Sequence, residues 1–267
     1  EILIPFNIPK EYKDREDYWL NIYFTLSNDT LWAEKGHEVA WHQFKIPNKP
    51  NEDLGLEENK IDVGSMEELI CEDLNKTISI KGFNFEIGFN KCNGTIEKWN
   101  YDGINMLNKG PSLNFWRAPI DNDMYVVKEW KEKFIHLLQS RLDGLEFRII
   151  NKSLIEVKTK VYISPPTLNW GIDCQFSYKI YGSGDVFIDL EGHPKGDLPD
   201  SLPRIGFKME IPKEFENITW YGRGPGESYS DSKLANKFGI YKKTVDGLHT
   251  PYVKPQENGN RTDVKWV

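Results

Sequence analysis

An arginine and two aspartates surround a proline in the segment Arg117-Ala118-Pro119-Ile120-Asp121-Asn122-Asp123. Such a loop can fix an arginine–carboxylate hydrogen-bond network, and its carboxylates can also bind sugar hydroxyls or a cation. The plainer interpretation is helix capping, which residue types alone favour, because Asp121 and Asp123 stand just ahead of a predicted helix. The two are not expected to be a catalytic pair, since closeness in sequence does not establish the separation of about 5 Å in a retaining glycosidase.

A second loop, Trp220-Tyr221-Gly222-Arg223-Gly224-Pro225-Gly226-Glu227, superficially resembles a phosphate-binding loop. It lacks the Gly-Lys-Ser/Thr ending of a P-loop. It also fails the dinucleotide-binding pattern, because Pro225 removes an amide and Glu227 replaces the third glycine. A nucleotide site is therefore excluded, and the loop with its Arg223 and Glu227 is either structural or faces another ligand.

A third loop, from Thr250 to Asp263, is rich in amides, charges and hydroxyls. Planar bidentate donors and acceptors of this kind suit sugar hydroxyls, although a self-satisfied polar loop has the same composition. Tryptophans that could stack on a sugar ring are the other hint. In a β-rich chain they are more often part of the core. They are Trp32, Trp41, Trp116, Trp170 and Trp220.

The elements that would position these loops are mostly strands. Apolar and polar residues alternate through segments that include 18–26, 83–89, 155–161 and 172–180, as in half-buried strands. Asn93-Gly94 predicts a tight hairpin turn. One helix is predicted around 126–139, from apolar residues at spacings of three and four. The pattern predicts an all-β, antiparallel sandwich and excludes a TIM barrel.

Composition limits the possible functions further. The 267 residues carry a formal net charge of -7, which argues against a nucleic-acid partner. No apolar run reaches the roughly 18 residues that a membrane helix needs. The three cysteines, Cys71, Cys92 and Cys174, show no metal-ligand spacing and are typical of a reducing compartment. Residues 48–73 are acidic and without periodicity, which predicts a solvated linker.

The three loops, in this order, resemble the C-terminal region of glycoside hydrolase family 2 β-galactosidases. The matching motifs are Arg117 to Asp123, Trp220 to Glu227, and Thr250-Pro251-Tyr252-Val253 with Pro255-Gln256-Glu257-Asn258-Gly259. Upstream, Trp32 to Gln43 resembles the last strands of the immunoglobulin-like domain of that family. The resemblance covers nearly the whole chain.

The resemblance implies three parts. Residues 1–48 would be a partial immunoglobulin-like β-sandwich and 49–75 an acidic linker. Residues 76–267 would be a C-terminally incomplete β-supersandwich, a fold shared with galactose mutarotases. Members of the family hydrolyse terminal β-galactosides such as lactose with retention, using two glutamates aided by Mg²⁺ and Na⁺. Those groups belong to a TIM barrel expected before Glu1, and a substrate-contacting tryptophan is expected beyond Val267, so the chain would be cut at both ends.

By the same resemblance, the chain carries no catalytic residue and no metal ligand. A first set of residues would form the rim of the active site: Arg117, Asp121, Asn122, Asp123, Met124 and Tyr125. A second set would support that rim or contact a neighbouring domain: Tyr221, Arg223, Glu227, Glu257 and Asn258. Met124-Tyr125 stand where the family often has a glycine and a longer loop, which argues against loop opening here.

Two rival functions stay open from the residues. A stand-alone carbohydrate-binding module would bind galactosides through an exposed tryptophan. A mutarotase-like enzyme would need a base and an acid in one pocket, for which His249 and Glu257 are the candidate pair. Under the leading interpretation the partners are the TIM barrel and other domains of the same enzyme and β-galactosides, with no nucleic acid and no membrane. A homo-oligomer in the cytoplasm is expected.

Overall fold

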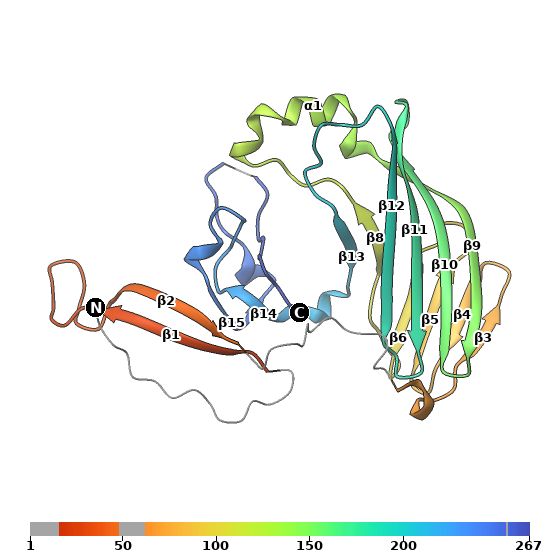
Figure 1. Cartoon of the computed structure of the whole chain (residues 1–267), viewed down its shortest axis with the longest axis horizontal. Helices are drawn as coiled ribbons and strands as arrows, with labels where there is room; N and C mark the ends of the chain where they lie inside the picture. The colour runs from red at the N-terminus through yellow and green to blue at the C-terminus, as the bar shows by residue number, and fades with distance from the viewer. Residues whose placement is uncertain (1–15, 48–61, 255) are drawn as a thin grey trace. The chain divides into compact units, whose positions relative to one another are not determined.

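The computed structural model describes residues 16–47, 62–254 and 256–267 of the chain (Figure 1). These residues form two compact units. Unit 1 combines residues up to Ile61 with Trp220–Tyr241 and Arg261–Val267, and unit 2 consists of Asp62–Thr219 and Lys242–Asn260. The first half of the predicted acidic linker, to residue 61, lies outside the described residues. The domain boundaries at 48 and 76 stay predictions.

Unit 2 contains two antiparallel sheets and a shorter strand pair. The first sheet has the order β3-β4-β5-β6-β7, from Ile70–Asp73, Thr77–Lys81, Phe85–Asn90, Ile96–Tyr101 and Ile104–Asn105. The second has the order β12-β11-β10-β9, from Val186–Gly196, Trp170–Tyr181, Leu154–Ser164 and Gln139–Asn151. The pair joins β8, Lys109–Asn114, to β13, Gly206–Glu210. The predicted all-β antiparallel fold is thereby confirmed.

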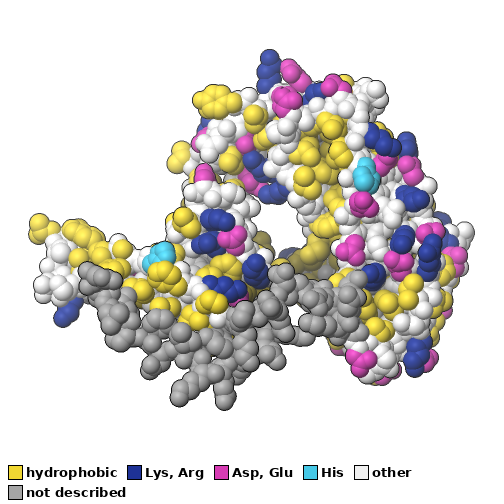
Figure 2. All heavy atoms as spheres, viewed as in Figure 1, with side chains coloured by type: hydrophobic (Ala, Val, Ile, Leu, Met, Phe, Trp, Pro, Cys, Tyr) yellow, Lys and Arg dark blue, Asp and Glu magenta, His cyan; other side chains and the backbone are white. Residues whose placement is uncertain are grey.

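The core of unit 2 lies between the inner faces of its two sheets. Every second residue of β10, β11 and β5 is buried, because successive side chains of a strand point to opposite faces. Trp170, Ile180 and Phe89 are among the fully buried side chains. Acidic and basic side chains intermingle on the outer surface over β9–β12 (Figure 2). The alternation read from the sequence is the physical origin of this sandwich.

The hairpin at Asn93-Gly94 is confirmed as a connection, but its turn is not the predicted one. β5 and β6 pair, and five residues, Lys91–Thr95, join them instead of two. Only Gly94 has a positive φ, of 72°. The side-chain oxygen of Asn93 accepts hydrogen bonds from the amide and the hydroxyl of Thr95, at 3.0 and 2.9 Å. The asparagine therefore stabilises a wider loop.

The single predicted helix is present but shorter than expected. α1 spans Val127–Glu132, and Phe134 then takes a left-handed conformation with a φ of 55°. A 3₁₀ helix, Ile135–Leu137, follows. The predicted range 126–139 was too long, because the apolar spacing of three and four continues from Trp130 to Phe134, where the helix is already broken. Within the described residues, no helix has the length and apolar character of a membrane span.

Unit 1 contains an N-terminal hairpin, whose first strand covers the segment predicted from the alternation at 18–26. β1, Tyr18–Thr25, and β2, Glu38–Ile46, pair antiparallel. A second pair is formed by β14, Asn217–Gly224, and β15, Lys237–Thr244, of which Trp220 to Tyr241 belong to unit 1. The Gln43 amide exchanges two hydrogen bonds of 2.8 Å with the backbone of Phe238, and the rings of Trp19 and Phe238 stack at 4.8 Å. Segments almost 200 residues apart in sequence therefore share one unit.

Short 3₁₀ helices complete the described structure. They are Val63–Ser65, Asp121–Tyr125, Ile135–Leu137, Lys213–Phe215, Lys233–Ala235 and Asp246–Leu248. The one at Asp121–Tyr125 ends directly before α1, so the motif leads into the helix without an intervening loop, as the sequence indicates.

Candidate functional site

The loop that follows β8 is held by a buried ion pair between Arg117 and Asp123. The Arg117 guanidinium donates to both carboxylate oxygens, at 2.5 and 2.9 Å, and its Nε donates to the Pro203 carbonyl at 3.2 Å. The side chains are 15% and 10% exposed. A bidentate geometry of this kind combines charge with a fixed orientation. Asp123 therefore stabilises the loop, and it is not an N-cap of α1.

Asp123 also fixes the start of its own 3₁₀ helix. One carboxylate oxygen accepts a hydrogen bond from the Ile120 amide at 2.7 Å. Burial alone would raise the pKa of Asp123, but the hydrogen bonds from Arg117 and Ile120 and the guanidinium charge outweigh it and hold the pKa below its usual value. The group is a charged structural anchor at neutral pH.

Glu257 adds a second carboxylate beside the Arg117–Asp123 ion pair, from a distant segment of the chain. Its carboxylate pairs with the Arg204 guanidinium and lies 3.8 Å from Arg117 Nε, with its side chain 10% exposed. Two arginines and two carboxylates from three segments, around 117–123, 204 and 257, thus form one group, which we call the arginine cluster. Arg204 was missed in the sequence, where it lies in a loop without any motif.

The other four predicted rim residues lie on the surface beside the arginine cluster. Asp121, Asn122, Met124 and Tyr125 are exposed, the last two by 66% and 84%. The Asp121 amide donates to the Gln256 side chain at 3.1 Å, and Lys254 Nζ lies 3.5 Å from the Asp121 carboxylate. The cluster therefore holds a turn that presents two polar and two apolar side chains outward.

Asn258 has a local role in the third loop. Its side-chain oxygen accepts a hydrogen bond from the Thr250 amide at 2.9 Å, and its nitrogen donates to the Thr250 carbonyl at 2.5 Å. These bonds close the loop between residues 250 and 258. The Asn258 amide therefore serves the backbone of its own loop. This agrees with the alternative that the polar side chains of the third loop satisfy one another's hydrogen bonds.

Tyr221, Arg223 and Glu227 belong to unit 1, where Tyr221 connects β14 to the N-terminal hairpin. Its hydroxyl donates to Asp17 at 2.7 Å and accepts from Trp19 Nε1 at 2.9 Å. Burial, and then the hydrogen bond to Asp17, raise the pKa of Tyr221 to about 12. Burial would raise the pKa of Asp17, but Lys45 and Tyr221 together lower it. Tyr221, Asp17 and Trp19 thus form a polar network inside unit 1.

Arg223 stabilises the glycine-rich loop of unit 1 through hydrogen bonds. Its Nε donates to Asp263 at 2.8 Å, and Nη1 donates to the carbonyls of Lys233 and Asn236 at 3.1 and 3.0 Å. The hydrogen bond from Arg223 lowers the pKa of Asp263. Glu227 accepts from the Tyr229 hydroxyl at 3.1 Å. The predicted second set is thus divided between two groups, one in each unit.

We expect Tyr221→Phe to destabilise unit 1 by about 1–2 kcal/mol, because Trp19 Nε1 and Asp17 each lose a hydrogen-bond partner. Chemical unfolding followed by tryptophan fluorescence measures the change. The matched control is Tyr23→Phe in the same unit. Tyr23 is 49% exposed, and its ring beneath Lys237 is kept in the variant. Equal effects of the two substitutions would contradict the role of the Tyr221 hydroxyl.

Three lowered carboxyl pKa values, those of Asp17, Asp123 and Asp263, predict a loss of stability in acid. Each folded pKa lies below the unfolded value of about 3.9, so each carboxylate stabilises the folded chain fully above that value. This contribution disappears as the pH falls through the folded pKa. The unfolding temperature at constant ionic strength should therefore fall between about pH 5 and pH 2. Asp123→Asn should make that fall shallower, and an unchanged slope would argue against the assignment.

Known proteins match the chain along almost its whole length. Residues 81–267 match the family model described as beta galactosidase small chain, and residues 1–47 match beta-galactosidase, domain 4. The first match covers more than half of the chain. This chain belongs to the β-galactosidase small-chain family. The resemblance predicted from the three loops is therefore confirmed.

Relatives of this family show how much of a whole protein the chain represents. It is 30% identical to a beta-galactosidase of Priestia megaterium over 100% of the chain and 25% of the relative. It is 32% identical to one of Psychromonas ingrahamii, over 93% of the chain and 25% of the relative. A third, from Kluyveromyces lactis, is 30% identical over 91% and 23%. The chain spans about a quarter of the length of these β-galactosidases.

The rival functions find little support beside this family assignment. Trp170 and Trp220 are each 2% exposed, so neither can stack on a sugar, whereas Trp32, in unit 1, is 67% exposed. His249 is exposed, whereas the Glu257 carboxylate is bound by Arg204, so the pair does not face one pocket as acid and base.

The described part of this small-chain family member contains no group of side chains that forms a cation site of the usual kind. Across residues 16–47, 62–254 and 256–267, no three histidine, cysteine or acidic side chains gather as metal ligands. In the arginine cluster, the oxygens of Asp123 and Glu257 already accept from guanidinium groups. That donor set does not fit Mg²⁺, which requires free oxygen ligands.

Proposed function

We propose that this chain is a non-catalytic part of a β-galactosidase, in which it shapes the rim of an active site carried by another domain. The proposal is supported by the family assignment together with the short span of the chain relative to its β-galactosidase relatives. In the whole enzyme, terminal β-galactosides such as lactose would be hydrolysed with retention by two glutamates on a TIM barrel.

The arginine cluster is the observation that carries this proposal. Arg117, Asp123 and Glu257 are only 10–15% exposed, Arg204 is 38% exposed, and together they tie the 3₁₀ helix Asp121–Tyr125 to two distant segments. Catalytic sites require substrate-contacting groups held to within a fraction of an ångström. The arginine cluster holds this turn while Asp121, Asn122, Met124 and Tyr125 stay exposed. Such a turn is suited to positioning groups at the rim of an active site.

The remaining expectations for the whole enzyme belong to the same proposal. Mg²⁺ and Na⁺ would bind outside the arginine cluster and supply positive charge that stabilises the transition state. The partners of this chain would be the TIM barrel and the other domains of the enzyme. The enzyme would be a cytoplasmic homo-oligomer.

Asp121→Ala in the full-length enzyme tests the rim role. We expect kcat/KM for lactose to fall roughly ten- to hundredfold, as when a positioning contact is lost. The unfolding temperature should hardly change, because among the described residues the Asp121 carboxylate makes only an exposed ion pair with Lys254.

The matched control is Asp189→Ala, which removes an exposed aspartate from β12 of the same unit. It should leave both kcat/KM and the unfolding temperature unchanged. If Asp121→Ala also kept its activity toward lactose and its stability, the rim role would be wrong. The family assignment would stand in either case.

A further inference from the structure

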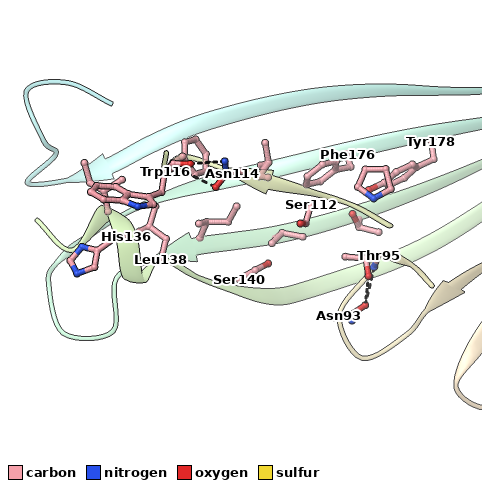
Figure 3. A pocket seen from close by; sticks show the side chains of 18 residues that line it. Asn93, Thr95, Ser112, Asn114, Trp116, His136, Leu138, Ser140, Phe176 and Tyr178 are labelled. Atoms are coloured by element: carbon pink, nitrogen blue, oxygen red, sulfur yellow. Dashed lines mark hydrogen bonds between the residues drawn. The ribbon is translucent and has the colours of Figure 1, made fainter. Parts of the chain in front are cut away.

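Unit 2 contains a pocket of about 150 Å³ that is partly open to solvent, and none of the four residues of the arginine cluster lines it. Its walls are the inner faces of β10 and β11, β8 with the following residues, the 3₁₀ helix at Ile135, and the turn Asn93–Thr95 (Figure 3). A hydrophobic cavity of similar volume in another protein admits benzene. The space is therefore sufficient for one small organic molecule.

Thr159 gives this cavity a polar feature that the fold does not explain. It lies in the middle of the inner face of β10, where the neighbouring inward residues are Val157 and Val161. The side chain is 1% exposed, and its hydroxyl oxygen has no hydrogen-bond partner among the described residues. A buried hydroxyl without a partner is unfavourable, so such a group points to an unassigned ligand or water.

The other lining groups limit what the ligand can be. The eighteen lining residues include no aspartate, glutamate, lysine or arginine, and His136, which also lines the pocket, is exposed to solvent. The buried part of the lining therefore carries no charged side chain that would compensate a charge on the ligand. The amide of Asn114 is already used by the backbone of Trp116, at 2.7 and 3.3 Å. Phe176 and Tyr178 contribute aromatic surface (Figure 3), and Tyr178 is 2% exposed. The walls thus combine apolar surface with hydroxyl groups.

We propose that this cavity binds a small uncharged molecule with an apolar ring and a single hydroxyl, of about the size of phenol. The ring would pack against Phe176 and Val161, and the hydroxyl would form a hydrogen bond with Thr159. This inference does not depend on the proposed function, because the cavity shares no residue with the arginine cluster.

The test compares phenol with toluene, which has the same shape but no hydroxyl, on the methyl-labelled full chain. NMR titration should show saturable shifts at the lining methyl groups of Leu138, Val161 and Ile163. The exposed methyl groups of Ile149 and Ile205, outside the cavity, should not move. Phenol should bind roughly three- to tenfold more tightly than toluene, as expected for one added hydrogen bond.

Thr159→Val is the matched variant, since it removes the hydroxyl and keeps the shape. It should bind toluene as before and lose the preference for phenol. The proposal is overturned if the lining methyl groups do not respond, if the shifts fall elsewhere, or if phenol and toluene bind equally to the unaltered chain. The last comparison needs no variant, so it decides the matter even if Thr159→Val fails to fold.

Discussion

Arg117→Met is expected to destabilise unit 2 by about 3–5 kcal/mol, the usual cost of removing one partner of a buried ion pair. The substitution keeps most of the side-chain volume but leaves the carboxylates of Asp123 and Glu257 buried, with Arg204 as the remaining cation. It also removes a donor from the Pro203 carbonyl. Thermal or urea unfolding monitored by circular dichroism measures the loss.

Lys254→Met is the control, because it removes a cation from an exposed pair with Asp121 in the same loop region. Exposed pairs contribute about 0–1 kcal/mol, so this variant should be close to neutral. The double variant Arg117→Met/Asp123→Leu should recover part of the loss, since it removes one of the stranded charges. A small effect of Arg117→Met would show that the cluster is not a structural anchor.

The strands were predictable because their pattern is local. Residues two apart point to the same face of a sheet, so the alternation from Ile155 to Val161 and from Ile172 to Ile180 is sufficient to assign two buried strands. The end of the helix was not predictable in this way. Phe134 continues the helical spacing from Trp130, yet its backbone is left-handed, and the residue types in this segment carry no signal for that turn.

The candidate site shows the same division between local and distant information. Arg117 and Asp123 are six residues apart, so their hydrogen-bond network could be proposed from the sequence. The pairing of Arg204 with Glu257 spans 53 residues, and the tertiary fold alone selects it. The family resemblance placed Tyr221 and Glu257 in one set, whereas the structure places them in different units.

The arginine cluster of unit 2 and the hydrogen-bonded residues around Tyr221 in unit 1 differ in the chemistry that they permit. In the arginine cluster the charges are paired and the outward turn stays exposed, which suits a surface that contacts a substrate or another domain. In unit 1 the Tyr221 hydroxyl donates to Asp17 and accepts from Trp19, so its hydrogen bonds are used inside the unit. Mutations at Tyr221 should therefore act through stability, and mutations at Asp121 through activity.

Burial decides the role of each tryptophan. Trp170→Ala is expected to lower the free energy of unfolding of unit 2 by about 3–5 kcal/mol. Trp170 begins β11, is 2% exposed, and donates its indole N–H to the Lys133 carbonyl at 3.1 Å. Its removal would leave a large cavity and an unpaired carbonyl at the C-cap of α1. The unfolding free energy from urea titration measures this effect.

Phe83→Ala is the matched control for Trp170→Ala, because it removes an aromatic ring that is 85% exposed in the same unit. Its effect should stay within about 0.5 kcal/mol. The sequence pattern wrongly assigned Phe83 to the buried face that begins at Phe85, so this pair also tests where that face starts. A large loss for Phe83→Ala would extend the core beyond the strand, and a small loss for Trp170→Ala would mean that its indole does not support the sandwich.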